Sequence, residues 1–234
     1  LKRMIPPLVP LESGGVFDIV AMDLIDLGPT RRGNRYALTV IDTFSKYGAA
    51  IPLKTKDKST VAQAFLDRWV LDGRVPKTVL TDNGTEFMND VMQEVSKIWM
   101  IDRRTTLPYH SRANGCCERF NKTIQEILRK NLPVATDWDE GIPYAVYAYN
   151  NSPHSVTGES PFYVVYGRDD PLPVGNIPET KDYMILEVDD FKTMHSVMMK
   201  KVHQIVSERL EEERARMKQT YDLKHQHNQG RVPV

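Results

Sequence analysis

Long apolar runs are missing from this sequence of 234 residues, and so is a charged leader followed by an apolar stretch. A membrane-spanning helix needs about 20 consecutive apolar residues, so we expect neither a membrane span nor a secretory signal. Cysteine is also scarce, because the only two are the neighbours Cys116 and Cys117, which are poorly placed to bridge each other. A disulfide framework is therefore excluded, and a reducing compartment is expected.

An excess of either charge sign is missing too. Lys plus Arg and Asp plus Glu both number 31, so net charge gives no argument for a nucleic-acid partner. The spacing typical of zinc ligands is absent, since the sequence has no C-x-x-C pair. The hydrophobic content is 41%, enough for the core of one good-sized domain with an appendage, or of two small domains.

The first half of the chain predicts a sheet crossed by helices. Apolar, branched and partly alternating segments indicate strands, and apolar residues at helical spacing indicate helices. The expected strands are residues 16–27, 36–47, 48–54, 77–82 and 101–107, and the expected helices are residues 58–73 and 86–99. In the first helix Ser59 is the expected N-cap and Gly73 the stop. This order of elements is typical of an α/β fold.

The second half predicts helices. A helix over residues 113–130 has an apolar face of Phe120, Ile124, Ile127 and Leu128, and a second helix covers residues 137–150. A loop and a short helix follow, and then a stretch rich in proline. The expected organisation is a leader (1–14), a core domain (15–168), a linker (169–182), a long charged and amphipathic helix (183–228) and a tail (229–234).

The long helix has an apolar stripe and no proline or glycine over residues 184–223. The stripe consists of Phe191, Met194, Met198, Val202, Ile205 and Leu210. It is a candidate interface between copies of the chain, although a solvated helix without a function of its own is an equally good interpretation.

Three carboxylates lie at positions that make them candidate functional residues. Asp23 lies inside the first strand, where burial of a carboxylate is expensive unless it is paired or bound to metal. Asp82 ends a strand, where α/β sheets commonly place their chemistry, although D-N-G is more often just a turn. Glu118 follows Asp82 with 35 residues between them, on the polar face of a helix that also carries Asn121, Lys122, Gln125 and Arg129. Three such carboxylates can converge on a pair of Mg²⁺ ions.

Five motifs then identify a family. They are MDLIDLGP, VIDTFSKY, TDNGTEF, LPYHSRANGCCERFNKTIQEIL and YNNSPHSVTGESPFYVVYG, in this order. From about Val16 to Gly167 the chain resembles the catalytic core of integrases from retroviruses and gypsy-type LTR retrotransposons, the D,D-35-E family. The resemblance implies an RNase H-like fold, with a mixed five-stranded sheet flanked by helices and followed here by the long C-terminal helix.

The resemblance also implies an activity. Asp23, Asp82 and Glu118 would be the catalytic triad and would bind two Mg²⁺ or Mn²⁺ ions. The enzyme would be a polynucleotidyl transferase that processes the 3′ ends of the element's DNA and joins them to target DNA. It would act in the nucleus after a cytoplasmic phase, as a homo-oligomer.

The expected DNA contacts lie around Glu118. They are Tyr109, Arg119, Asn121, Lys122 and Gln125, in a segment where seven basic residues face two acidic ones between Arg103 and Lys130. Ser111-Arg112 and Cys116-Cys117 depart from the family pattern and leave the triad intact. Two alternatives stay open: a domesticated integrase-derived host protein that binds DNA or protein without catalysis, and an RNase H-type nuclease.

Overall fold

The structure is a computed structural model that describes residues 13–82, 90–105, 115–132, 134–170 and 188–226. Five strands form one sheet in the order β3-β2-β1-β4-β5. They are β1 (Ile19–Asp26), β2 (Tyr36–Asp42), β3 (Gly48–Leu53), β4 (Thr78–Thr81) and β5 (Asp102–Thr105). Strands β1, β2 and β3 pair antiparallel, whereas β4 and β5 run parallel to β1. The predicted mixed five-stranded sheet is therefore confirmed.

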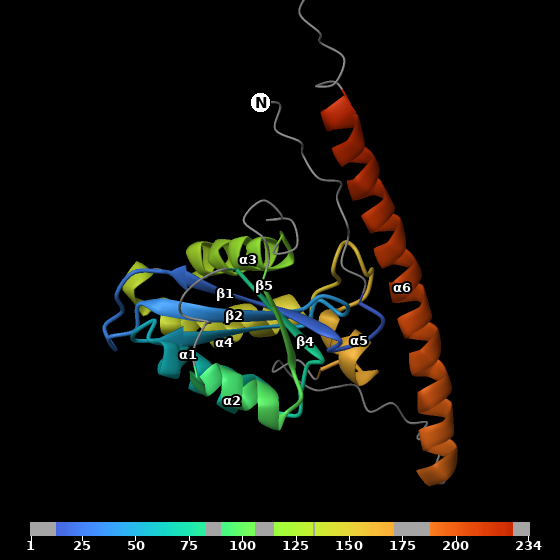
Figure 1. The fold of residues 1–234 in the computed structure, drawn as a ribbon, viewed down its shortest axis with the longest axis horizontal. Coiled ribbons are helices and arrows are strands. Elements are labelled where there is room, and N and C mark those ends of the chain that lie inside the picture. The colour runs from blue at the N-terminus through green and yellow to red at the C-terminus, as the bar shows by residue number, and fades with distance from the viewer. Residues whose placement is uncertain (1–12, 83–89, 106–114, 133, 171–187, 227–234) are drawn as a thin grey trace, which may run out of the picture.

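Helices cover both faces of this sheet (Figure 1). They are α1 (Lys58–Phe65), α2 (Asp90–Ile98), α3 (Gly115–Asn131), α4 (Trp138–Asn150), α5 (Pro161–Tyr166) and α6 (Val188–Gln226), with a π-helical turn (Leu66–Val70) after α1 and a 3-10 turn (Ala135–Asp137) before α4. The prediction of Ser59 as N-cap is wrong, because α1 begins at Lys58 and its N-cap is Asp57, two residues earlier. The Asp57 carboxylate accepts a hydrogen bond from Thr55 Oγ1 at 2.6 Å and makes no cap hydrogen bond.

Strand β1 supplies both halves of the core, because successive side chains of a strand point to opposite faces. Val20 and Met22 pack with α1 and α2, and Ile19 and Ala21 pack with α3 and α4. In Figure 1, α3 lies above the sheet and α1 and α2 lie below it. The same alternation places Asp23 on the face covered by α3.

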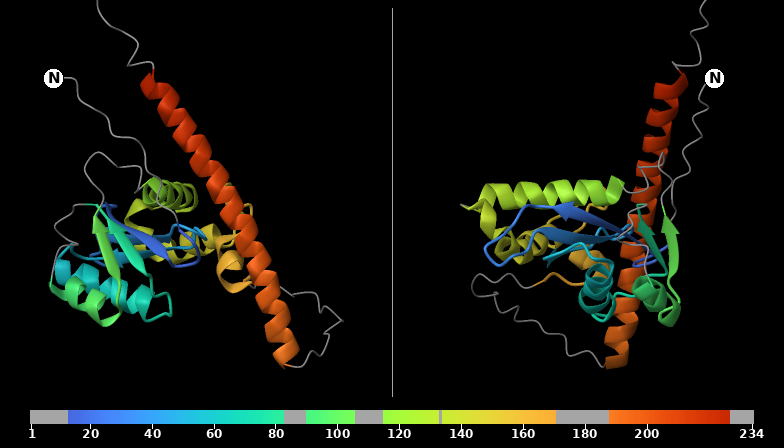
Figure 2. Two further views of the ribbon diagram at one scale, coloured as in Figure 1. Left: turned by 45° about the vertical axis from the view of Figure 1, so that its right-hand side comes forward. Right: turned by 60° about the vertical axis from the view of Figure 1, so that its left-hand side comes forward.

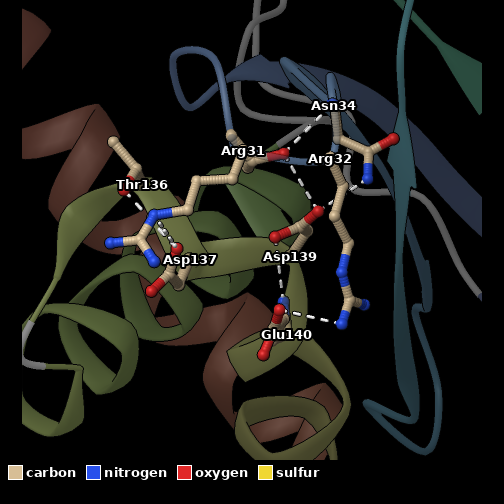
Figure 3. Close-up of polar contacts among 8 residues, drawn as sticks. Arg31, Arg32, Asn34, Thr136, Asp137, Asp139 and Glu140 are labelled. Carbon is tan, nitrogen blue, oxygen red and sulfur yellow. Dashed lines mark hydrogen bonds and ion pairs between the residues drawn. The ribbon is translucent and has the colours of Figure 1, made fainter.

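The turn between β1 and β2 is fastened to the start of α4 (Figure 3). Trp138 Nε1 donates to Gly28 O at 2.9 Å. Thr30 Oγ1 and Asn34 Nδ2 both donate to Asp139 Oδ2, at 3.0 and 2.7 Å. Two exposed ion pairs flank these contacts, Arg31 with Asp137 at 3.4 Å and Arg32 with Glu140 at 2.8 Å. The buried hydrogen bonds thus hold α4, and with it the α3 side of the core, against the end of the sheet.

We expect Asp139→Ala to lower the free energy of unfolding by about 1–3 kcal/mol, because it leaves the buried Thr30 hydroxyl without its acceptor. Glu140→Ala is the matched control, since it removes only an exposed ion pair worth up to about 1 kcal/mol. Urea denaturation of both variants measures the difference. Equal losses would contradict the role of Asp139.

The same contacts set the pH dependence of the effect. Burial acts to raise the pKa of Asp139, but the hydrogen bonds from Asn34 and Thr30 outweigh it and the pKa is lowered. A lowered pKa in the folded state stabilises the protein above the unfolded pKa of about 3.9, and this stabilisation is lost as pH falls through the folded pKa. The difference in free energy of unfolding between the parent and Asp139→Ala should therefore become smaller as the pH falls below the unfolded pKa.

Helix α6 runs along one side of the core and extends beyond it at both ends (Figure 2). Val206 and Leu210 are buried against Phe44 and Val164, and His203 Nε2 lies 2.9 Å from Val164 O. No helix in the described ranges is long and apolar enough to cross a membrane.

The predicted apolar stripe of α6 is divided between two surroundings. Val202 and Leu210 pack on the chain's own core, whereas Met194, Met198 and Ile205 are exposed. The side chain of Phe191 lies outside the described residues. The interpretation of the whole stripe as an interface between copies is therefore wrong for its buried members. The predicted leader, linker and tail fall mostly outside the described residues, so their boundaries stay predictions.

Candidate active site

Asp23 projects from the middle of β1 toward α3. Its Oδ1 accepts a hydrogen bond from the Leu24 N–H at 2.8 Å, and its Oδ2 accepts one from Asn121 Nδ2 on α3 at 2.7 Å. On the neighbouring strand β2, Thr39 is the register partner of Asp23, and its Oγ1 donates to Asp23 O at 3.2 Å. Asp23 is therefore held by the sheet and by the helix together.

Asp82 directly follows β4, beside Asp23. The parallel register pairs Ala21 with Leu80, and two residues further along the two strands stand Asp23 and Asp82. Ala21 and Leu80 both belong to the α3 side of the core, so alternation directs both carboxylates to that same face. Adjacent strands lie about 4.8 Å apart, which makes these two aspartates neighbours.

Glu118 belongs to the first turn of α3 and is exposed. The helix is positioned by its apolar side, where Phe120, Ile124 and Leu128 are buried against the sheet. A glycine is needed where this side meets β3, because a Cβ added at Gly48 would lie 2.5 Å from the Phe120 ring. Close packing at Gly48 therefore sets how near the helix, and Glu118 on it, comes to the strands.

Asp82 and Glu118 both act electrostatically on Asp23. The pKa of Asp23 is raised, first by burial and then by the negative charges of Asp82 and Glu118, against the opposing hydrogen bonds from Leu24 and Asn121. A cation between the three groups would relieve this repulsion. Oxygen atoms from carboxylates are the ligands that Mg²⁺ takes, so the donor set fits such an ion.

The three carboxylates are not arranged around a common metal position in this structure. No group of three or more His, Cys, Asp or Glu side chains within the described ranges is arranged to hold a metal ion. Glu118 stands exposed at the beginning of α3. The residues thus fit a divalent cation in their chemistry, because they are carboxylates and Asp82 and Glu118 both act on Asp23.

Cys117 is not a candidate nucleophile. Cys117 is fully buried on the core side of α3, and its thiol pKa is raised well above the usual value, first by burial and then by nearby negative charge. A buried thiol that stays protonated is a packing group rather than a nucleophile.

The predicted DNA contacts separate into three groups. Arg119 and Lys122 are exposed on α3, and Gln125 is half-buried there. Tyr109 lies outside the described residues. Asn121 is only 5% exposed, and its amide is engaged with Asp23, so its assignment as a DNA contact stays a prediction. Its spacing of three residues from Glu118 correctly indicated a shared flank of the helix, but its burial depends on Asp23, which the helix pattern alone does not show.

Comparison with known proteins gives a consistent assignment. Residues 15–111 match the family model described as "Integrase core domain". The chain is 31% identical over 210 residues to the retrovirus-related Pol polyprotein from transposon 412 of Drosophila melanogaster, covering 89% of this chain and 17% of that protein. It is 33% identical over 165 residues to the Pol polyprotein of Radiation murine leukemia virus (strain Kaplan), covering 69% and 28%. The chain thus spans less than a third of these relatives.

Solved structures share the fold. The HTLV-2 integrase catalytic core domain in complex with magnesium, in its trimeric form, superposes with a TM-score of 0.51 at 24% identity, covering 67% of this chain and 97% of that one. The simian T-cell lymphotropic virus intasome in complex with PP2A regulatory subunit B56 gamma gives 0.61 at 20% identity, covering 78% and 66%. The predicted RNase H-like fold is confirmed by these likenesses.

Proposed function

We propose that this chain is an integrase catalytic core that processes and joins DNA ends, because residues 15–111 match the integrase core domain model and the chain is similar to retrotransposon and retroviral Pol polyproteins. The observation that carries this proposal is that Asp82 and Glu118 lie near enough for their charges to act on Asp23. The chemistry would be phosphodiester transfer dependent on Mg²⁺ or Mn²⁺, with two ions.

The chain's own groups would divide the work. Asp23, Asp82 and Glu118 would hold the ions, which when bound activate the attacking oxygen and stabilise the leaving oxygen. Asn121 keeps Oδ2 of Asp23 in a fixed direction through its 2.7 Å hydrogen bond. Arg119 and Lys122, exposed on the same helix, would contact DNA phosphates, and Tyr109 and Gln125 would contact the DNA end.

The two reactions have the same form. In end processing, a water oxygen attacks a phosphorus near the 3′ end, the bond from that phosphorus to the 3′ oxygen breaks, and a 3′-hydroxyl is released. In strand transfer, this hydroxyl attacks a phosphorus of target DNA and displaces another 3′ oxygen. Neither reaction needs a Ser or Cys nucleophile, which is consistent with the buried thiol of Cys117.

Product analysis tests the function. The chain is incubated with Mg²⁺, a labelled duplex DNA end and a target duplex, and separately with an RNA–DNA hybrid. Joined DNA that disappears on addition of a chelator is the expected result. Cleavage of only the RNA strand would instead support an RNase H-type nuclease, and no product with either substrate would support a domesticated binding protein.

We also propose that the protein acts in the nucleus, after a cytoplasmic phase, and as a homo-oligomer. The proposed joining of an element's DNA to target DNA is the support for this location. The solved HTLV-2 core domain has trimeric and dimeric forms. In this chain, Met194, Met198 and Ile205 on α6 are exposed apolar side chains available for such contacts.

A further inference from the structure

A cavity of about 830 Å³ lies on the flank of α3 that faces away from Asp23. Arg119, Thr123 and Ile127 line it from the helix. With 3.6 residues per turn, these positions project to the side opposite Asn121. The remaining walls are the turn between β2 and β3, the end of α4 with the loop that follows it, and Glu213 of α6.

Lys46 forms the inner wall of the cavity. It is only 7% exposed, and its backbone has a φ of +66°, a left-handed conformation that favours glycine. Its ammonium donates to Thr43 O at 2.5 Å and lies 3.8 Å from Cys116 Sγ. An ammonium has three donors, so one has no partner among the residues that the structure describes.

Within the described residues, Lys46 has no carboxylate at ion-pair distance. The acid that acts on it from nearby is Asp42, which is fully buried. The Asp42 oxygens accept hydrogen bonds from the N–H groups of Phe17, Phe44 and Ser45 and from Ser45 Oγ. The Asp42 carboxylate is therefore used by hydrogen bonds other than to Lys46. A buried ammonium without a hydrogen-bonded anion is costly in free energy.

His154 contributes a neutral donor. Its Nδ1 accepts the Val156 N–H at 3.2 Å, so in the neutral ring Nε2 carries the proton. The pKa of His154 is lowered to about 4, first by burial and then by the positive charges of Lys46 and Arg119. The same two cations thus act on His154, which also lines the cavity.

The lining carries one more positive than negative side chain. Lys46, Arg119 and Lys122 are cationic, and two carboxylates, Glu126 and Glu213, also line the cavity. The loop after α4 adds the hydroxyl groups of Ser152 and Ser155. A phosphate group has several acceptor oxygens and matches a set made of ammonium, guanidinium, imidazole N–H and hydroxyl donors.

We propose that this cavity is a phosphate-binding subsite in which Lys46, Arg119 and His154 hold one phosphate group. The proposal rests on the proposed function for its source, a phosphodiester of a DNA strand that crosses the exposed side of α3 at Lys122. Such a strand would be held on both flanks of the helix, by the carboxylates with their metal ions on one side and by this subsite on the other.

Two measurements on the 234-residue chain test the subsite. The first is the dependence of DNA affinity on salt concentration, measured without divalent metal. In Lys46→Met the slope of log affinity against log salt should fall by about one, the value for one lost phosphate contact. The second is thermal stability in inorganic phosphate compared with chloride at equal ionic strength, where Lys46→Met should lose the shift shown by the parent. Lys97→Met, at an exposed position of α2, should change neither.

Arg119→Gln repeats both measurements at an exposed residue, in case Lys46→Met fails to fold. A lost thermal shift with an unchanged DNA slope would support a phosphate site that takes a free phosphate compound instead of DNA. An unchanged slope together with an unchanged thermal shift, in folded variants, would overturn the subsite. A parent chain that neither binds nor joins DNA would overturn the proposed function, and the phosphate shift would still decide the subsite separately.

Discussion

Glu118→Gln should reduce DNA strand transfer by on the order of a hundredfold or more. Even residues that merely orient metal ligands cost about 10- to 100-fold when they are replaced, and this change removes the charge of a proposed ligand itself. The measurement is the rate of joined product with Mg²⁺, compared with the parent. Glu94→Gln is the control, because Glu94 is an exposed carboxylate on α2 paired with Lys97 at 2.8 Å.

Folding should be unaffected in this variant. Glu118 is exposed on the first turn of α3, and substitutions at such positions usually change stability by less than about 0.5 kcal/mol. Thermal unfolding of the parent and both variants checks this. Equal strand-transfer activity in Glu118→Gln and the parent would remove Glu118 from the active site.

Phe120→Ala should lower the free energy of unfolding by about 3–5 kcal/mol, the usual cost of truncating a buried phenylalanine. Phe120 is 1% exposed, its ring meets Tyr149 at 4.8 Å between centroids, and it packs directly on Gly48. The substitution also removes the contact between α3 and Gly48 of the sheet. We therefore expect the position of Glu118 relative to Asp23 to become less well defined. Urea denaturation measures the change in stability.

The control for this variant is Tyr144→Ala on α4. Tyr144 is also a large aromatic residue but is 79% exposed, so its truncation should change stability by less than about 0.5 kcal/mol. A loss at Phe120 no larger than that at Tyr144 would mean that α3 is not held on the sheet by this contact.

Local sequence patterns were sufficient to predict features that depend on a single helix or strand. The apolar, partly alternating segment 16–27 predicted a strand where β1 lies. The helical spacing of Phe120, Ile124 and Leu128 predicted the buried face of α3. The motifs around Asp82 and Glu118 indicated the site, and the parallel register then shows why Asp82 is next to Asp23.

Long-range contacts limited what the sequence could predict. In the sequence Asn121 is one of several polar residues of a helix. Its hydrogen bond to Asp23, 98 positions away in the chain, becomes visible only in the folded structure. The sequence shows the apolar residues of α6 as one continuous stripe. In the structure part of this helix packs on Phe44 and Val164 of the same chain. Lys46 shows no signal at all, because its left-handed turn and the cavity beside it depend on α3 and on the loop after α4.

The central claim is that Asp23, Asp82 and Glu118 bind divalent metal together. Anomalous diffraction from crystals of this chain grown with Mn²⁺ tests it most directly. The expected result is a peak within coordination distance, about 2.0–2.6 Å, of carboxylate oxygens from Asp23 and Asp82, with Glu118 turned toward the same site and the peak absent in Asp23→Asn. Peaks only at other places, or an undiminished peak in Asp23→Asn, would contradict the claim.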